Sequence, residues 1–147
     1  MLLRIQHYDF QLEEFAEVSR DEAVRLFQQT DWWSELARFA EARQHGYQPC
    51  NVGMELTDDS GCRLFIGPVD RRSVCFNYIY PRFHSEFGLC QIEREEERFV
   101  ASYPIEAVGR LITLHYKSER GAILQIESEE IRTGLTWRED GSGGGRP

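Results

Sequence analysis

The sequence predicts an α+β fold, in which helices pack on a mostly antiparallel sheet. Apolar residues recur at helical spacing within residues 20–44 and after Pro104, whereas they alternate with polar residues over much of 52–80. Strands that follow one another through short turns pair antiparallel. The 147 residues fit one domain. We therefore expect two N-terminal helices and one C-terminal helix on one sheet, in a single domain across residues 1–140.

The N-terminal segment begins as a strand, because residues 3–7 alternate between apolar and polar side chains. An acidic stretch, residues 9–22, follows it. Near its end Ser19, with Glu22 three residues later, has the pattern of a capping box. These signals predict a helix from Arg20 to about Gln29. The side chains that this helix should bury are Ala23, Leu26 and Phe27.

A second helix is expected after Thr30-Asp31, which is another cap signal, and Gly46 marks its end. One kinked helix in place of two is the alternative. Trp32 and Trp33 are adjacent, so on a helix their side chains point about 100° apart. We expect one of them in the core and the other partly exposed, where a tryptophan can anchor a partner.

The central segment predicts a meander of strands. Residues 52–56 and 62–66 alternate on either side of Asp58-Asp59-Ser60-Gly61, which is turn chemistry. A third strand is expected over Val74–Tyr80, stopped by Pro81. Each of these strands should therefore be short.

Two further short strands, Leu89–Glu93 and Arg98–Ser102, are expected around a turn at residues 94–97. Pro104 suits the first turn of the C-terminal helix, which Gly121 should close.

The C-terminal part of the sequence is harder to interpret. Residues 122–131 alternate only in part, and Leu135-Thr136-Trp137 predicts a short last strand. The segment 141–147 has the composition of a flexible Gly-rich linker.

Composition excludes several function classes. The net charge of −8 argues against binding a nucleic-acid backbone, which needs clustered Lys and Arg. No apolar run approaches the roughly 20 residues of a membrane helix, and the first residues lack the pattern of a secretory signal. We therefore expect a soluble, cytoplasmic protein that contacts neither nucleic acid nor membrane, and whose charge suits a basic protein partner.

Sequence motifs for catalysis are absent. The chain lacks G-x-S-x-G, G-x-G-x-x-G, the P-loop motif and H-E-x-x-H. His84-Ser85-Glu86 matches half of a zinc-deaminase signature, but the P-C-x-x-C half is missing. The four cysteines include no C-x-x-C pair, which favours buried thiols, with disulfides or a metal site as the alternatives. We expect no catalytic residue, no metal and no cofactor.

The acidic residues carry the strongest binding signal. Four glutamates lie at the expected turn between the last two strands of the meander. They are either a solvated hairpin tip or a surface that meets a basic partner. Residues 9–22 form a second acidic surface with the same two interpretations. The candidate contact residues are Glu93, Glu95, Glu96, Glu97, Asp58, Asp59, Trp32 and Tyr80.

The order of elements resembles the immunity proteins that are paired with deaminase-type toxins in bacterial polymorphic toxin systems. The likeness spans about residues 18–138 and departs from the family pattern at 119–132. It rests on the helix entry Val18-Ser19-Arg20-Asp21-Glu22-Ala23, the turn Asp59-Ser60-Gly61, the strand through Phe99 and Val100, the helix carrying Ile105, Ala107 and Val108, and Leu135-Thr136-Trp137.

The resemblance implies a protein without enzymatic activity that binds a toxin made by the same cell and occludes its active site. Toxins acting on nucleic acid carry basic grooves, which an acidic inhibitor would suit. The resemblance transfers no catalytic residue and implies that Trp137 is a packing residue.

Two alternatives remain open. One is a small ligand-binding domain or enzyme whose cavity is lined by Tyr78, Tyr80, His84 and Cys75. The other is a structural adaptor or secretion chaperone for a basic effector.

Overall fold

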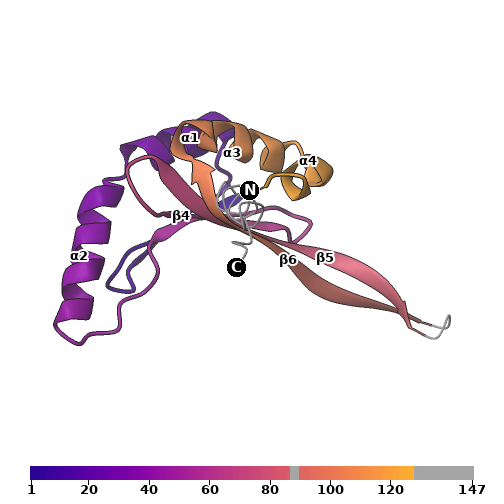
Figure 1. Cartoon of the computed structure of the whole chain (residues 1–147). Helices are drawn as coiled ribbons and strands as arrows, with labels where there is room; N and C mark the ends of the chain where they lie inside the picture. Colours follow the sequence, from indigo (N-terminus) through magenta and orange to yellow (C-terminus); the bar gives the residue numbers. More distant parts are fainter. Residues whose placement is uncertain (87–89, 128–147) are drawn as a thin grey trace, which may run out of the picture.

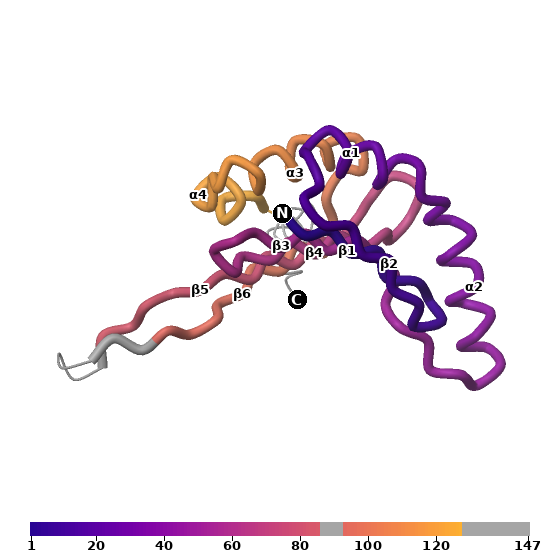
Figure 2. Tube along the Cα trace, turned by 180° about the vertical axis from the view of Figure 1, so that it is seen from behind, coloured from indigo at the N-terminus to yellow at the C-terminus, as the bar shows by residue number. Residues whose placement is uncertain are grey.

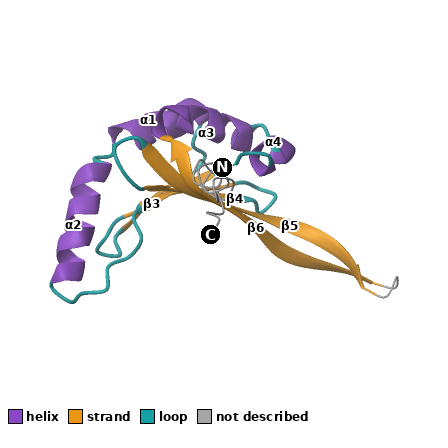
Figure 3. Cartoon of the chain, viewed as in Figure 1, coloured by secondary structure: helices purple, strands orange, loops and turns teal. Residues whose placement is uncertain are grey.

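A computed structural model describes residues 1–86 and 90–127 of the chain (Figure 1). It confirms the α+β class: a six-stranded antiparallel sheet, of strand order β2-β1-β3-β4-β5-β6, with helices packed on it (Figure 3). The elements are β1 (Leu2–Gln6), β2 (Leu12–Phe15), α1 (Arg20–Gln29), α2 (Trp32–Gln44), β3 (Gly53–Thr57), β4 (Arg63–Pro68), β5 (Ser73–Glu86), β6 (Cys90–Pro104), the 3-10 turn η1 (Ile105–Ala107), α3 (Val108–Tyr116) and α4 (Arg120–Leu124).

The two N-terminal helices begin where their caps predict. The Ser19 hydroxyl accepts the backbone N–H of Glu22 at 3.3 Å, and the Asp31 carboxylate accepts that of Ser34 at 3.1 Å. Gly46 has a φ of +80° just after α2, in the left-handed region that glycine tolerates. Local hydrogen bonding therefore sets these helix ends.

Strand β2 was not expected from the sequence. Its residues are Leu-Glu-Glu-Phe, and only Phe15 is partly buried. The strand forms because it pairs with β1 in a register that places Arg4 opposite Glu14. This pairing also divides the predicted acidic surface of residues 9–22 between a strand and the start of α1.

The core lies between one face of the sheet and the layer formed by α1, α3 and α4, which Figures 1 and 2 show arched over the strands. The Tyr116 hydroxyl donates to the Val18 carbonyl at 2.7 Å and ties α3 to the segment before α1. Leu26 is only partly buried, whereas the other two side chains predicted for the core side of α1 are buried. The residues of the hydrophobic core include Leu3, Ala23, Phe27, Met54, Leu56, Leu64, Ile66, Phe76, Tyr78, Leu111, Ile112 and Ile123.

Strand β5 does not stop at Pro81, contrary to the prediction. Its neighbour β4 begins at Arg63, which pairs with Ile79, so the β4 side of β5 is unpaired beyond that point. The Pro81 carbonyl accepts from the Arg120 side chain at 3.4 Å, which indicates that it faces this unpaired side. In an antiparallel strand the carbonyl and the N–H of a residue point the same way, so the N–H that proline lacks lies on this free side. Proline at this position therefore removes no hydrogen bond between β5 and β6.

Strand β6 is one element of 15 residues, so the prediction of two strands around a turn at 94–97 is wrong. Pairs from Ser73–Pro104 to Glu86–Cys90 run along both long strands. The glutamates therefore lie along a strand and alternate between its two faces. The end of this hairpin falls at residues 87–89, outside the described part of the chain. The long hairpin projects beyond the rest of the sheet (Figures 1 and 2).

The C-terminal region contains two short helices where one was predicted. The chain turns at Ser118, whose φ is +55°, and Gly121 lies inside α4 instead of ending a helix. The predicted strand Leu135–Trp137 and the tail 141–147 lie outside the described residues. In residues 1–86 and 90–127, no helix has the length and apolar composition needed to cross a membrane.

Candidate protein-binding face

The sheet face opposite α1, α3 and α4 is called the open face below. One row of paired residues crosses it from edge to edge. Arg4 on β1 lies between Glu14 and Glu55, Glu55 is paired with Phe65 on β4, and the row continues through Asn77 to Phe99. Because strand side chains alternate, Glu93, Glu95 and Glu97 of β6 share this face with Phe99.

Carboxylates outnumber guanidinium groups on this face. Arg4 Nε contacts Glu14 at 2.8 Å, and its Nη1 lies 3.4 Å from Glu55. Arg63 donates to Glu95 at 2.8 Å, whereas Glu97 accepts only an amide N–H, from Asn77 at 3.2 Å, among the hydrogen bonds assigned to it. The strand carboxylates are Glu14, Glu55, Glu93, Glu95 and Glu97, against Arg4 and Arg63. The open face therefore carries a net negative charge, and its two arginines form ion pairs with glutamates of the same face.

The centre of the open face is apolar. The Phe65 ring lies against Gly53 and Gly67, so closely that a Cβ at Gly53 would be 2.4 Å from Phe65 Cζ and 2.6 Å from the Ile66 carbonyl. Phe99, on the edge strand β6, is 59% exposed, and Phe83 further along the hairpin is 64% exposed. Aromatic side chains, phenylalanine included, are enriched in protein interfaces relative to the rest of the surface.

Two hollows lie next to Phe65. One, of about 480 Å³, lies among β1, β3 and β5 and includes Arg4, Glu55 and Ile79. The other, of about 330 Å³, lies between the sheet and α2, and Leu36 and Phe39 form its α2 wall. Both hollows are lined by Asn51 and Phe65. Helix α2 is therefore one side of the open face.

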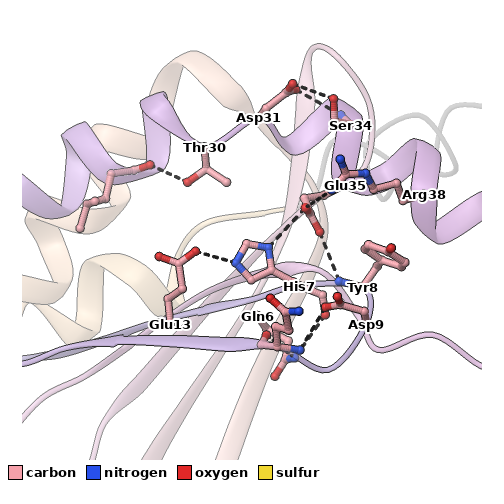
Figure 4. Close-up of polar contacts among 12 residues, drawn as sticks. Gln6, His7, Tyr8, Asp9, Glu13, Thr30, Asp31, Ser34, Glu35 and Arg38 are labelled. Carbon is pink, nitrogen blue, oxygen red and sulfur yellow. Dashed lines mark hydrogen bonds and ion pairs between the residues drawn. The ribbon is translucent and has the colours of Figure 1, made fainter.

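A polar cluster positions α2 (Figure 4). His7 Nε2 lies 2.8 Å from Glu13 Oε1, and His7 Nδ1 lies 3.3 Å from Glu35 Oε1. Glu35, on α2, is only 8% exposed and accepts the backbone N–H of Tyr8 at 3.3 Å. Arg38 lies 3.7 Å from Glu35 on the same helix. Side chains from β1, β2 and α2 thus meet at one imidazole.

The structure brings together only part of the predicted contact set. Glu93, Glu95 and Glu97 lie in one row, but Glu96 is on the opposite side of β6. There it accepts from the Tyr80 hydroxyl at 2.9 Å and contacts Arg82 and His84, each at 3.0 Å. The hydrogen bonds from Arg82 and Tyr80 lower the pKa of the Glu96 carboxyl. Glu96 stabilises the hairpin and does not belong to the open face.

Two other predicted contacts, Trp32 and Tyr80, lie away from the open face. Trp32 is 4% exposed, so it is the core member of the tryptophan pair and Trp33 the partly exposed one. Tyr80 is buried on the helix side, with the Arg120 guanidinium 5.1 Å from its ring centre. Each is removed from the open face by packing against the helical layer.

The remaining predicted contacts, Asp58 and Asp59, lie in the β3–β4 turn. The Asp58 carboxylate accepts the backbone N–H groups of Ser60 and Cys62, both at 2.9 Å. It therefore closes the turn. Both aspartates line a separate hollow with Glu17 and Tyr116, so they do not extend the glutamate row.

The residues of the alternative ligand cavity do not converge. Tyr78 and Tyr80 stack at 5.7 Å on the helix side of β5, and His84 lies beyond them on the same side, next to Glu96. Cys75 has the opposite orientation and lines the hollow beside α2. Cys50, Cys62 and Cys75 are unpaired thiols, but only Cys62 is buried. In the described ranges, no cluster of three or more His, Cys, Asp and Glu residues could hold a metal ion.

Sequence reasoning missed Phe65, Phe99 and the glutamates of β2 and β3 as members of one face. The signal was present in β6. If Glu93–Phe99 is treated as one strand, positions 93, 95, 97 and 99 fall on one side. The row of residues that crosses the sheet could not be predicted, because it depends on the order of the strands, which no local pattern contains.

Comparison of the chain with protein-family models, with curated proteins and with solved structures found no match.

Proposed function

We propose that this chain is an immunity protein of the producing cell's cytoplasm, which binds a toxin with a basic surface and blocks its active site without catalysing a reaction. The observation that carries the proposal is the open face, where Phe65 lies next to Glu55 on β3 and the exposed Phe99 follows Glu93, Glu95 and Glu97 along β6. The resemblance noted from the sequence supports the same function.

The glutamate row of β6, which consists of Glu93, Glu95 and Glu97, suits a toxin groove that binds nucleic acid. Alternate residues of an extended strand lie about 6.8 Å apart, so Glu93, Glu95 and Glu97 present negative charge at regular intervals. A toxin that acts on nucleic acid holds a regularly spaced phosphate backbone with Lys and Arg. These basic side chains would attract the glutamate row, and their pairing with it would exclude the substrate.

Charge and apolar contact would contribute differently to inhibition. Complementary charge raises the association rate, and this contribution weakens as salt increases. Aromatic side chains that become buried on binding slow dissociation. The face offers both kinds of group within one surface.

Charge reversal on the open face should weaken toxin binding. We expect the Glu93→Lys, Glu97→Lys double variant to raise the Kd about 10- to 100-fold, mainly through slower association. Surface plasmon resonance at two salt concentrations would measure the Kd and the association rate. The matched control is Glu106→Lys with Glu119→Lys, which makes the same charge change at exposed sites on the helical side. Equal losses in the two double variants would exclude the open face as the interface.

Truncation of the exposed Phe99 side chain should raise the rate at which the toxin dissociates. Phe99→Ala removes a ring that is largely solvent-exposed, so we expect the free energy of unfolding to change by less than about 1 kcal/mol. If the ring is buried against the toxin, the same change should speed dissociation about 10- to 30-fold. An unchanged dissociation rate would place Phe99 outside the interface.

The function itself is tested by growth rescue. The product of the neighbouring gene, as candidate toxin, is expressed with and without this protein. Rescue together with arrest of the purified toxin's activity would support immunity. A stable complex without arrest of activity would instead favour an adaptor or secretion chaperone. If no rescue and no complex are seen, the immunity proposal is rejected.

A further inference from the structure

His7 lies where three elements meet, at the end of β1, beside β2 and below α2 (Figure 4). Each ring nitrogen faces a different carboxylate, with Nε2 at 2.8 Å from Glu13 and Nδ1 at 3.3 Å from Glu35. A neutral imidazole donates through one nitrogen and accepts through the other, whereas a carboxylate only accepts. Both contacts can therefore be hydrogen bonds only when the ring is protonated.

We propose that His7 is a proton-operated clamp, which holds α2 against the sheet by linking Glu13 and Glu35 when protonated and loosens α2 when it loses the proton. The clamp itself depends on neither a toxin nor any other partner.

Loss of the proton would loosen α2 because few buried residues hold this helix against the sheet. Its buried residues are Trp32, in the first turn, and Glu35, one turn later. A buried carboxylate needs compensating partners. A neutral His7 can donate to only one of its two carboxylates, and Glu13 at 2.8 Å is nearer than Glu35 at 3.3 Å. Glu35 then keeps the Tyr8 N–H at 3.3 Å and Arg38 at 3.7 Å. Movement of the helix beyond Trp32 would return Glu35 to water.

The charged groups around His7 favour its protonated form. They are Glu13 on β2 and, on α2, Glu35 with its neighbour Arg38, while Asp9 in the following turn accepts the Gln11 N–H. Partial burial alone would lower the pKa of His7, but the hydrogen bonds and charges of the two glutamates outweigh it and raise the pKa above its ordinary value of about 6.5.

The direction of the pH effect follows from the raised pKa. A group with a higher pKa in the folded state stabilises that state fully below the unfolded value, about 6.5 here. That stabilisation disappears as the pH rises through the pKa of the folded state. We therefore expect α2 to be held firmly in mild acid and to loosen at neutral to alkaline pH.

The clamp has a consequence for the open face, and this consequence rests on the proposed function. Leu36 and Phe39, just after Glu35, form the α2 wall of the hollow that contains Phe99. Loosening α2 would change the width of this hollow. Toxin affinity would then depend on pH through His7.

Amide hydrogen exchange tests the clamp on the protein alone. Protection factors, corrected for the intrinsic pH dependence of exchange, are measured from pH 5.5 to 8.5 for wild type, His7→Gln and His45→Gln. His45 is an exposed histidine at the C-terminal end of α2 and serves as the matched control. We expect protection over residues 36–44, relative to β3, to fall about threefold to tenfold as pH rises in wild type and His45→Gln. His7→Gln should show low protection at every pH.

Two results would overturn the clamp. The first is a His7→Gln protein whose α2 protection still depends on pH as in wild type. The second needs no variant: an NMR titration of wild type in which the His7 ring titrates at or below pH 6.5. Loss of toxin binding in other experiments would reject the proposed function and leave these measurements valid, so the two failures are distinguishable.

Discussion

Trp32→Ala should lower the free energy of unfolding by about 3–5 kcal/mol. The side chain is 4% exposed, and its ring centre lies 5.4 Å from that of Phe27. The indole N–H donates to the Phe27 carbonyl at 2.8 Å, near the C-terminal end of α1. Removing the ring leaves a cavity between the first two helices and also removes a donor from a buried carbonyl. Urea denaturation followed by circular dichroism would measure the loss.

The adjacent tryptophan is the control for this prediction. Trp33 is only partly buried, so Trp33→Ala should cost clearly less, about 1–2 kcal/mol. Under conditions where both variants remain folded, neither change should abolish toxin binding through the open face. A Trp32→Ala protein that is as stable as wild type but fails to bind would restore Trp32 as a contact residue.

Gly53→Ala should be the next most damaging substitution and cost about 3 kcal/mol. The new Cβ would lie 2.6 Å from the Ile66 carbonyl, which the β3–β4 pairing holds in place, and 2.4 Å from the Phe65 ring. Either the two strands separate locally or the ring is displaced from the open face. The same denaturation experiment would show the loss, and near-ultraviolet circular dichroism would report any displacement of aromatic rings.

A matched glycine and a double variant sharpen this experiment. A Cβ at Gly121, in α4, meets nothing within 4 Å, so Gly121→Ala should be neutral or stabilising by up to about 1 kcal/mol. Adding Phe65→Ala to Gly53→Ala removes the ring contact but leaves the carbonyl contact. We expect the two changes to be non-additive, with only part of the cost of Gly53→Ala recovered. Full recovery would show that the backbone contact yields easily.

The helices were largely predictable because their determinants are local. Ser19 and Asp31 each cap the residues that follow them, and a 3.6-residue apolar period needs no distant partner. The β3–β4 hairpin was predictable for the same reason, since Asp58 closes its turn through backbone groups at most four residues away. These elements agree with the structure in kind and nearly in length.

The long hairpin was not predictable from local patterns. Pro81 and the run Arg94–Glu97 both indicate a chain break, and the exposed end of a two-stranded hairpin has no buried face to impose alternation. Pairing of β5 with β6, the next strand in the chain, continues both elements through these residues. The predicted acidic turn therefore becomes two opposite faces, with Glu96 on one and its three neighbours on the other.

The α+β class, the starts of α1 and α2, the central hairpin and the acidic balance follow from composition and from contacts within a few residues, so they could be predicted before folding was considered. The tertiary structure was needed to decide which tryptophan is buried, because that depends on how α2 is rotated against Phe27. It likewise decided that Phe65, Phe99 and the glutamates share one face, because a face is defined by strand order and register. Both are products of pairing between residues distant in the chain.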